Sequence, residues 1–134
     1  MKYLLDTCIV SYFVKGEKNV LNHIKSTSPK DIYISSTTLM EIEFGLLLNP
    51  ARTKKLKPII ESFIESINIL PFHDNDAICA ANVRVALQKK GNIIGAYDIL
   101  LAGSALHHGF IFVTANIKEF ERVSGLLIEN WLES

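Results

Sequence analysis

Three isolated acidic residues, Asp6, Glu41 and Asp98, stand in apolar or small-residue stretches of this sequence. A carboxylate beside an apolar core is costly to leave unpaired, so each needs a proton, a hydrogen-bond partner or a cation. Carboxylate oxygens are hard ligands that suit Mg²⁺ or Mn²⁺. If the three side chains meet in one cleft, they predict a divalent metal site. Their mutual repulsion there would raise at least one pKa in the metal-free protein.

Each acid also has a purely structural explanation. Asp6 stands between a predicted strand and a predicted helix, where it could cap the helix. Glu41 follows Thr38 by three residues, which is the spacing of a capping box. Asp98 falls in the first turn of a predicted helix, where the helix dipole favours a negative charge. Considered singly, structure and function explain each acid about equally well.

The elements that must position these acids alternate between strand and helix. Short apolar runs predict four to five strands, at residues 2–5, 32–34, 67–70, 110–113 and 126–128. Helical spacing of apolar side chains predicts intervening helices, among them 7–15, 39–48, 51–66, 74–90 and 96–108. Buried strands alternating with helices are typical of a parallel sheet covered on both faces. We therefore expect an α/β fold, a single three-layer α/β/α domain over residues 1–134 with a mostly parallel central sheet.

This arrangement favours a shared site over three separate caps. Asp6 lies at the carboxyl end of the first predicted strand, the edge at which open α/β sheets bind ligands. The helix of Asp98 is otherwise so apolar that most of its faces must be buried. Gly95 and Ala96 precede Asp98 and leave open space around its carboxylate.

A fourth acidic position follows the strand at residues 110–113. Thr114 and Asn116 lie at its carboxyl end, and Asn116 could bind a metal or its water through the amide oxygen. Glu119, three residues further on, could supply a charge. A turn residue and a solvated surface acid are the ordinary explanations of Asn116 and Glu119, so we rank this position below the first three.

Composition limits how the chain could meet nucleic acid. Fourteen basic residues balance 14 acidic ones, so no overall field recruits a polyanion, and a local patch is needed. The hydroxyls of Thr7 and Ser36, at predicted helix starts, could contact phosphate. The basic candidates for phosphate binding are Arg52, Lys54, Lys55, Lys57, Lys89 and Lys90. A solvated charged face is the ordinary explanation of any one of them.

The cysteines and histidines give no zinc motif. Cys8 and Cys79 form no CxxC pair, and the four histidines include no pair spaced i, i+4. His107 and His108 are adjacent, so we expect their side chains to point in different directions on a helix and to favour its C-terminal dipole. No signal-peptide pattern and no apolar run of roughly 18 residues is present, so we expect a cytoplasmic protein without a membrane span.

Four motifs, in order along the chain, resemble those of PIN-domain ribonucleases, specifically the VapC-type toxins of type II toxin–antitoxin pairs. The matching stretches are residues 3–7, residues 35–41 with Gly45, residues 94–102, and residues 113–123 followed by Gly125-Leu126 and Glu129-Asn130-Trp131. The resemblance runs from the N-terminus almost to the C-terminus. It implies a PIN-like fold and a metal-dependent endoribonuclease.

The resemblance also assigns roles within the site. It implies that Asp6, Glu41 and Asp98 hold Mg²⁺, with Mn²⁺ as a possible substitute, and that Glu41 acts directly or through a water. Asn116 stands where many family members have Asp, so the resemblance leaves a second metal position open. The implied reaction is hydrolysis of an RNA phosphodiester bond by a metal-activated water, leaving a 5′-phosphate and a 3′-hydroxyl.

Partners follow from the same resemblance. The family implies an RNA substrate, with tRNA anticodon stem-loops a known choice among relatives. It also implies a homodimer and a cognate VapB-like antitoxin that inhibits the enzyme and can build a higher hetero-oligomer. Contact with DNA is expected only through the antitoxin.

Two other classes of function stay open. A haloacid-dehalogenase-like phosphatase would carry a second Asp two residues after the first, where this chain has Cys8, and a phosphoreceiver would pair Asp6 with another acid. A catalytically inactive module that binds RNA or protein is the third hypothesis. The intact trio of acids argues against it.

Overall fold

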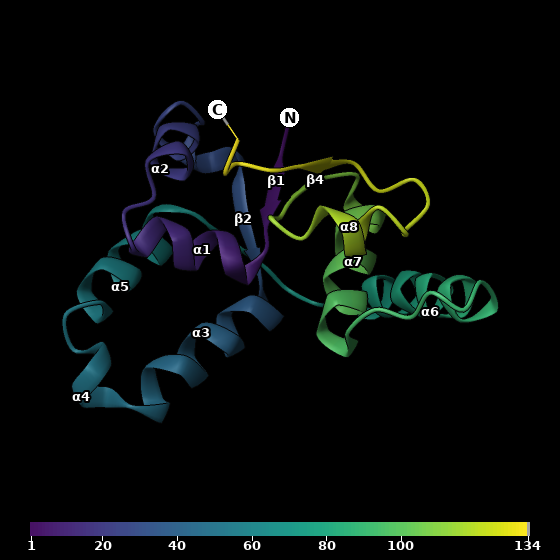
Figure 1. Ribbon diagram of the computed structural model, residues 1–134, viewed down its shortest axis with the longest axis horizontal. Coiled ribbons are helices and arrows are strands. Elements are labelled where there is room, and N and C mark those ends of the chain that lie inside the picture. Colours follow the sequence, from purple (N-terminus) through teal and green to yellow (C-terminus); the bar gives the residue numbers. More distant parts are fainter. Residues whose placement is uncertain (134) are drawn as a thin grey trace.

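A five-stranded sheet forms the middle layer of the computed structural model, which describes residues 1–133 (Figure 1). Its strands are β1 (Tyr3–Leu5), β2 (Ile32–Ser35), β3 (Asn68–Leu70), β4 (Ile111–Val113) and β5 (Ile128–Glu129). They are all parallel and lie in the order β3-β2-β1-β4-β5. The predicted α/β class and strand number are confirmed, and the last strand begins two residues later than its apolar run suggested.

Helices cover both faces of the sheet. One core contains side chains of α1 (Thr7–Val14), α2 (Lys18–Lys25), α3 (Ser36–Leu48) and α5 (Lys57–Ser66). The other core contains side chains of α6 (Asp74–Lys89), α7 (Ala96–His108) and α8 (Ile117–Phe120). A short helix, α4 (Pro50–Thr53), and a 3₁₀ turn at Pro29–Asp31 complete the elements.

The strands alternate their side chains between these two cores. Leu4 packs into the core with α6 and α7, whereas Leu5 packs into the core with α1 and α3. Phe112 and Val113 divide in the same way. Because successive strand residues point to opposite faces, a continuous apolar run is what a sheet buried on both sides requires. The three-layer prediction is therefore confirmed.

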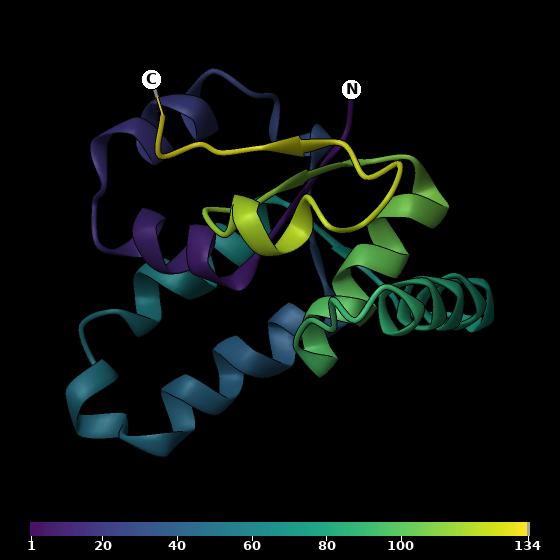
Figure 2. The ribbon, with the colours of Figure 1, turned by 45° about the vertical axis from the view of Figure 1, so that its right-hand side comes forward.

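The strand order reverses its direction between β1 and β4, which makes a topological switch point at the carboxyl ends of these strands. From β1 the chain moves outward to β2 and β3 on one side, and it then crosses to β4 and β5 on the other. The carboxyl ends of β1 and β4 therefore border the crevice in which open α/β sheets bind ligands. Figures 1 and 2 show the starts of α1, α3 and α7 converging below this edge.

Two local predictions change in the structure. The N-cap of α3 is Ser35, whose side chain accepts a hydrogen bond from Thr37 N, so Thr38 lies inside the helix. The capping box at Thr38 and Glu41 is therefore wrong, as is a capping role for Thr38, because the helix begins before these residues. The region 51–66 forms two helices instead of one, and Pro58 lies in the first turn of the second, where proline is tolerated.

Cys8 and Cys79 are free, half-buried thiols. None of the helices within residues 1–133 has both the length and the apolarity needed to cross a membrane.

Helices α6 and α7 cross at a very short distance. A Cβ atom added to Gly103 would lie 2.7 Å from the Cα, Cβ and N atoms of Ala80, which is well inside contact distance. Gly103 is buried, so neither backbone can move away without disturbing the core above it. The glycine is thus required by the close approach of the two helices.

We predict that Gly103→Ala destabilises the protein by about 1–3 kcal/mol, the cost typical of overpacking, although alanine is the better helix former. Gly45→Ala is the matched control, because Gly45 also lies within a helix but has open space around it. The control should gain up to about 1 kcal/mol from helix propensity. Urea unfolding of both variants measures the difference, and a Gly103→Ala protein as stable as Gly45→Ala would contradict the close approach.

Candidate metal centre

Asp6 caps α1 and also faces the switch-point crevice. Its Oδ1 accepts a hydrogen bond of 2.8 Å from Thr7 N, which confirms the predicted N-cap. Its Oδ2 accepts one of 2.8 Å from Thr114 Oγ1 and a longer one of 3.5 Å from Cys8 Sγ. Burial raises the pKa of Asp6 above its ordinary value, although these hydrogen bonds and Thr7 N oppose the shift; the charge of Glu119 adds to it.

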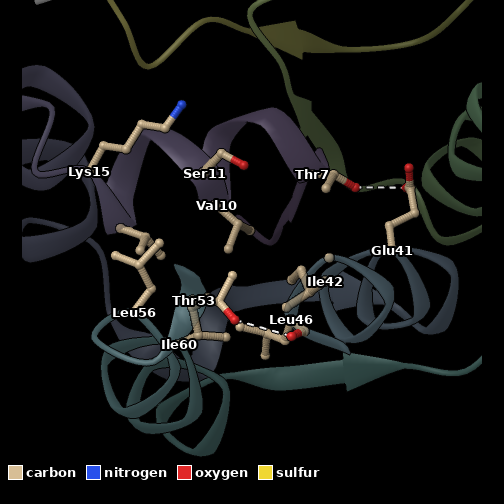
Figure 3. Close-up of a pocket in the computed structure, with 12 residues that line it drawn as sticks. Thr7, Val10, Ser11, Lys15, Glu41, Ile42, Leu46, Thr53, Leu56 and Ile60 are labelled. Carbon is tan, nitrogen blue, oxygen red and sulfur yellow. Dashed lines mark hydrogen bonds between the residues drawn. The ribbon is translucent and has the colours of Figure 1, made fainter. Parts of the chain in front are cut away.

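Glu41 is held by the start of α1. Thr7 Oγ1 donates a 2.8 Å hydrogen bond to Glu41 Oε1, and Figure 3 shows this contact at one end of a groove. The same hydroxyl lies 3.3 Å from Thr38 Oγ1. Thr7 therefore joins the elements that carry Asp6 and Glu41, since its amide binds the first carboxylate and its hydroxyl the second.

Asp98 lies in the first turn of α7, as predicted, and the other acids act on it. Burial, a hydrogen bond with Glu119, and the negative charges of Glu119, Asp6 and Glu41 raise the pKa of Asp98 to about 7. The expected raised pKa in an acidic pocket is therefore found at Asp98 and Asp6. The charges of the other three carboxylates therefore reach Asp98.

The pKa of Glu119 shifts in the opposite direction to that of Asp98, with which it is hydrogen-bonded. Burial alone would raise the pKa of Glu119, but hydrogen bonds from Asp98, Gly95 N and the Asn116 amide, with the charge of Arg122, hold it below its usual value. The Gly95 N–H donates at 3.1 Å, and Asn116 Nδ2 donates to the other carboxylate oxygen. The pKa of Asp98 is therefore raised and that of Glu119 lowered.

The secondary candidates have separate roles. Thr114 is fully buried and donates to Asp6, while its hydroxyl accepts a hydrogen bond of 3.0 Å from Asn116 N. Asn116 is exposed, and its amide is bound to Glu119. Glu119 is thus the fourth acidic side chain near Asp6, Glu41 and Asp98, and Asn116 binds it.

Among the phosphate candidates, Thr7 contacts the acids of the site, whereas the basic residues lie on other elements. Ser36 Oγ donates to the Leu70 carbonyl oxygen at 3.3 Å, and Thr7 Oγ1 donates to Glu41. Arg52 and Lys54 are exposed at α4, which Figures 1 and 2 show beyond the end of α3 that is distant from the sheet. Lys55 and Lys57 follow them, and Lys89 and Lys90 end α6.

Two neighbours of the site were not singled out from the sequence. Cys8 donates to Asp6, and its position two residues after the acid on a predicted helix was the available signal. Burial and the Asp6 charge raise the pKa of the Cys8 thiol to about 11, which makes it a poor nucleophile. Arg122, three residues after Glu119, stabilises the charge of that carboxylate.

A groove begins beside Glu41. It has a volume of about 220 Å³ and runs between α1, α3 and the segment of α4 and α5. Val10, Ile42 and Leu46 give it a mainly apolar lining, and Thr7 and Glu41 stand at one end (Figure 3). Glu41 is therefore the acid of the site that lines this mainly apolar groove.

The carboxyl groups suit a hydrated divalent ion. Among residues 1–133, the trio of possible ligand atoms within 4.8 Å of one another is Asp76, His107 and His108, so the acids of the crevice are more widely spaced. Mg²⁺ usually keeps several of its waters, which lets one or two carboxylates bind it directly and others through water. Hard carboxylate oxygens are the ligands that this ion prefers.

Comparison with known proteins agrees with this geometry. The PIN domain family model matches residues 3–126. A Salmonella typhimurium tRNA(fMet)-specific endonuclease VapC is 33% identical over 131 residues, covering 98% of each chain, and a Haemophilus influenzae ribonuclease VapC2 is 34% identical over 133 residues, covering 98% of this chain and 99% of the relative.

Solved structures show the same likeness. The VapBC2 complex of Rickettsia felis bound to a promoter DNA fragment contains a chain that superposes with a TM-score of 0.90 at 30% identity, covering 98% of this chain and 99% of the other. DNA-bound VapBC from Salmonella typhimurium gives a TM-score of 0.89 at 31% identity, with 98% of each chain covered. The chain therefore belongs to the PIN-domain family, among the VapC ribonucleases of toxin–antitoxin systems.

Proposed function

We propose that this VapC ribonuclease is a Mg²⁺-dependent endonuclease whose metal is held by Asp6, Asp98 and Glu41, with Glu119 completing the acidic crevice. The observation that carries the proposal is the mutual influence of these four carboxyl groups at the switch point of the sheet. Four acids in one crevice are costly for folding alone, so a bound cation gives a physical reason for them. Mn²⁺, with the same preference for oxygen, is expected to substitute.

The chain's own residues prepare this site in three ways. Thr114 and Thr7 orient the carboxylates of Asp6 and Glu41 through hydrogen bonds of 2.8 Å each. Asp98 must be ionised to act as a ligand, so its raised pKa makes metal binding compete with protonation. When bound, Mg²⁺ supplies positive charge that neutralises phosphate oxygens and lowers the pKa of water.

The proposed substrate is RNA, and tRNA is the class that we favour. Two relatives covering 98% of this chain are named as tRNA(fMet)-specific endonucleases. Hydrolysis by water would leave a 5′-phosphate and a 3′-hydroxyl, and it needs no nucleophilic side chain. Action on cellular tRNA would take place in the cytoplasm.

The proposed regulator is a cognate VapB-like antitoxin. Several structural relatives are VapBC complexes, two of them bound to DNA, so we propose that this chain meets DNA only through such a partner. The apolar groove that starts at Glu41 would receive an antitoxin segment and bring it to the acids. Phe44, Leu47 and Leu48 on α3 are each at least 60% exposed and offer apolar surface for the antitoxin or a second copy in a homodimer.

Each competing function has an observation against it. A phosphatase would act on small phosphomonoesters through an aspartate nucleophile paired with a second acid, but position 8 is a cysteine with a raised pKa. An inactive binding module would have no need to keep four acids together. Turnover of a small phosphomonoester by the purified protein would favour the phosphatase over the ribonuclease.

Replacing the acids should abolish cleavage without unfolding the protein. For Asp6→Asn, Asp98→Asn and Glu41→Gln we expect losses beyond the roughly 10–100-fold that removal of an orienting partner costs. The assay is cleavage of total tRNA in Mg²⁺ by protein freed of antitoxin, with thermal unfolding measured in parallel. Glu43→Gln is the matched control, an exposed acid on the same helix two residues from Glu41, and it should cleave normally. Unchanged cleavage by Asp6→Asn and Asp98→Asn would contradict the assignment of these residues to the metal site.

Thr114→Val should weaken the site indirectly. The substitution keeps the shape of the side chain but removes the hydrogen bond to Asp6, so we expect about a 10–100-fold loss of metal affinity or activity. The control is Thr27→Val, because the Thr27 hydroxyl donates to the His23 carbonyl oxygen on another element. Calorimetric titration with Mn²⁺ measures affinity, and equal values for the two variants would show that Thr114 does not orient Asp6.

Metal-free protein should lose stability relative to Asp98→Asn as pH rises. Between the ordinary value of 3.8 and the folded pKa of about 7, the unfolded chain has released the Asp98 proton but the folded chain still holds it. The unfolded state therefore binds fewer protons, and the free energy of unfolding falls as pH increases. Urea unfolding with chelator at pH 5 and pH 8 tests this. A constant difference between the two proteins would refute the raised pKa.

A further inference from the structure

A second group of metal-ligating side chains lies where α6 and α7 meet. Asp76, in the first turn of α6, and His107 and His108, at the end of α7, place possible ligand atoms within 4.8 Å of one another. The prediction that the two histidines point in different directions is therefore wrong. Their ring centroids are 4.7 Å apart in the last turn of the helix, and His108 Nε2 lies 3.4 Å from Asp76 Oδ2 on α6.

Asp76 is a fixed and charged member of this group. Its side chain is 1% exposed, and its Oδ2 accepts a hydrogen bond of 2.7 Å from Ser104 Oγ. Its Oδ1 accepts a weaker one of 3.4 Å from His73 N. Burial alone would raise the pKa of Asp76, but these hydrogen bonds and the two histidines hold it below its usual value. Asp76 is thus an ionised carboxylate inside the protein.

His108 leaves a buried nitrogen without a partner. Its Nε2 is shielded from solvent and makes no hydrogen bond among residues 1–133, but it lies 3.4 Å from Asp76 Oδ2, an ion pair when the imidazole is protonated. A buried nitrogen that makes no hydrogen bond is costly, and such groups often mark an ion or water. A cation bound by both atoms would satisfy both.

We propose that Asp76, His107 and His108 bind a Zn²⁺-class transition-metal ion that ties the end of α7 to the start of α6. Imidazole nitrogen with one carboxylate suits Zn²⁺, Ni²⁺ or Cu²⁺ better than Mg²⁺. Ligands at ordinary Zn²⁺ distances lie about 3.3 Å apart, so the group must close slightly, and the exposed His107 ring is free to rotate. Ser104 orients the carboxylate, and the C-terminal dipole of α7 favours the cation.

This site is separate from the acidic crevice. Asp98 and His108 lie on the same helix ten residues apart, and a rise of 1.5 Å per residue puts them about 15 Å from each other. The two sites also differ in donors, because one offers carboxylate oxygen alone and the other mainly imidazole. An excess of Mg²⁺ should therefore occupy the first site and leave the second open to Zn²⁺.

Calorimetric titration of the full chain with Zn²⁺ in excess Mg²⁺ tests the proposal. We expect one equivalent to bind and the thermal midpoint to rise, His107→Ala to weaken binding at least tenfold, and His107→Ala/His108→Ala to abolish it. His107 is exposed, so its replacement should not unfold the protein. Asp98→Asn is the control and should bind Zn²⁺ as the unaltered chain does.

Two results would overturn the proposal. The first is the absence of Zn²⁺ binding by the unaltered chain in excess Mg²⁺. The second is binding that survives in His107→Ala/His108→Ala and disappears in Asp98→Asn, which would assign the Zn²⁺ to the acidic crevice. Absorption spectra with Co²⁺ as the probe give an independent measurement, since imidazole ligands should produce visible bands that the double variant lacks.

Discussion

Repulsion among Asp6, Glu41, Asp98 and Glu119 is the constraint on which the rest of this structure depends. Burial, with the hydrogen bond and charge of Glu119 and the charges of Asp6 and Glu41, raises the pKa of Asp98 to about 7. The chain reduces the cost of keeping these acids together with hydrogen bonds from Thr7, Thr114 and Gly95 N. A cation completes this balance, which is why the crevice is better understood as a metal site than as a set of helix caps.

The fold supplies the rigidity that such a crevice needs. Short strands with apolar side chains on both faces place two cores around the sheet, and these cores hold the helix starts at its carboxyl edge. Asp6 follows the central strand, Glu41 lies on the helix after β2, and Asp98 begins the helix that returns to β4. The acids are thus fixed by elements that are stabilised elsewhere, and the site need not contribute to folding.

The pattern of neighbouring residues predicted the helices and strands better than it predicted the contacts between them. The position of Asp6 after a buried strand and of Asp98 in an apolar helix could be read from neighbouring residues. The hydrogen bonds from Thr7 to Glu41 and from Thr114 to Asp6 could not, because they join residues 34 and 108 positions apart. The capping box at Thr38 failed because α3 begins earlier, and the separation expected for His107 and His108 failed because their helix ends there.

The most direct test of the metal centre is anomalous diffraction from crystals of the chain soaked in Mn²⁺. The proposed metal site predicts an anomalous peak within coordination distance of Asp6 and Asp98, with Glu41 bound directly or through a water. Mn²⁺-saturated crystals of active protein with no peak between these carboxylates would contradict it.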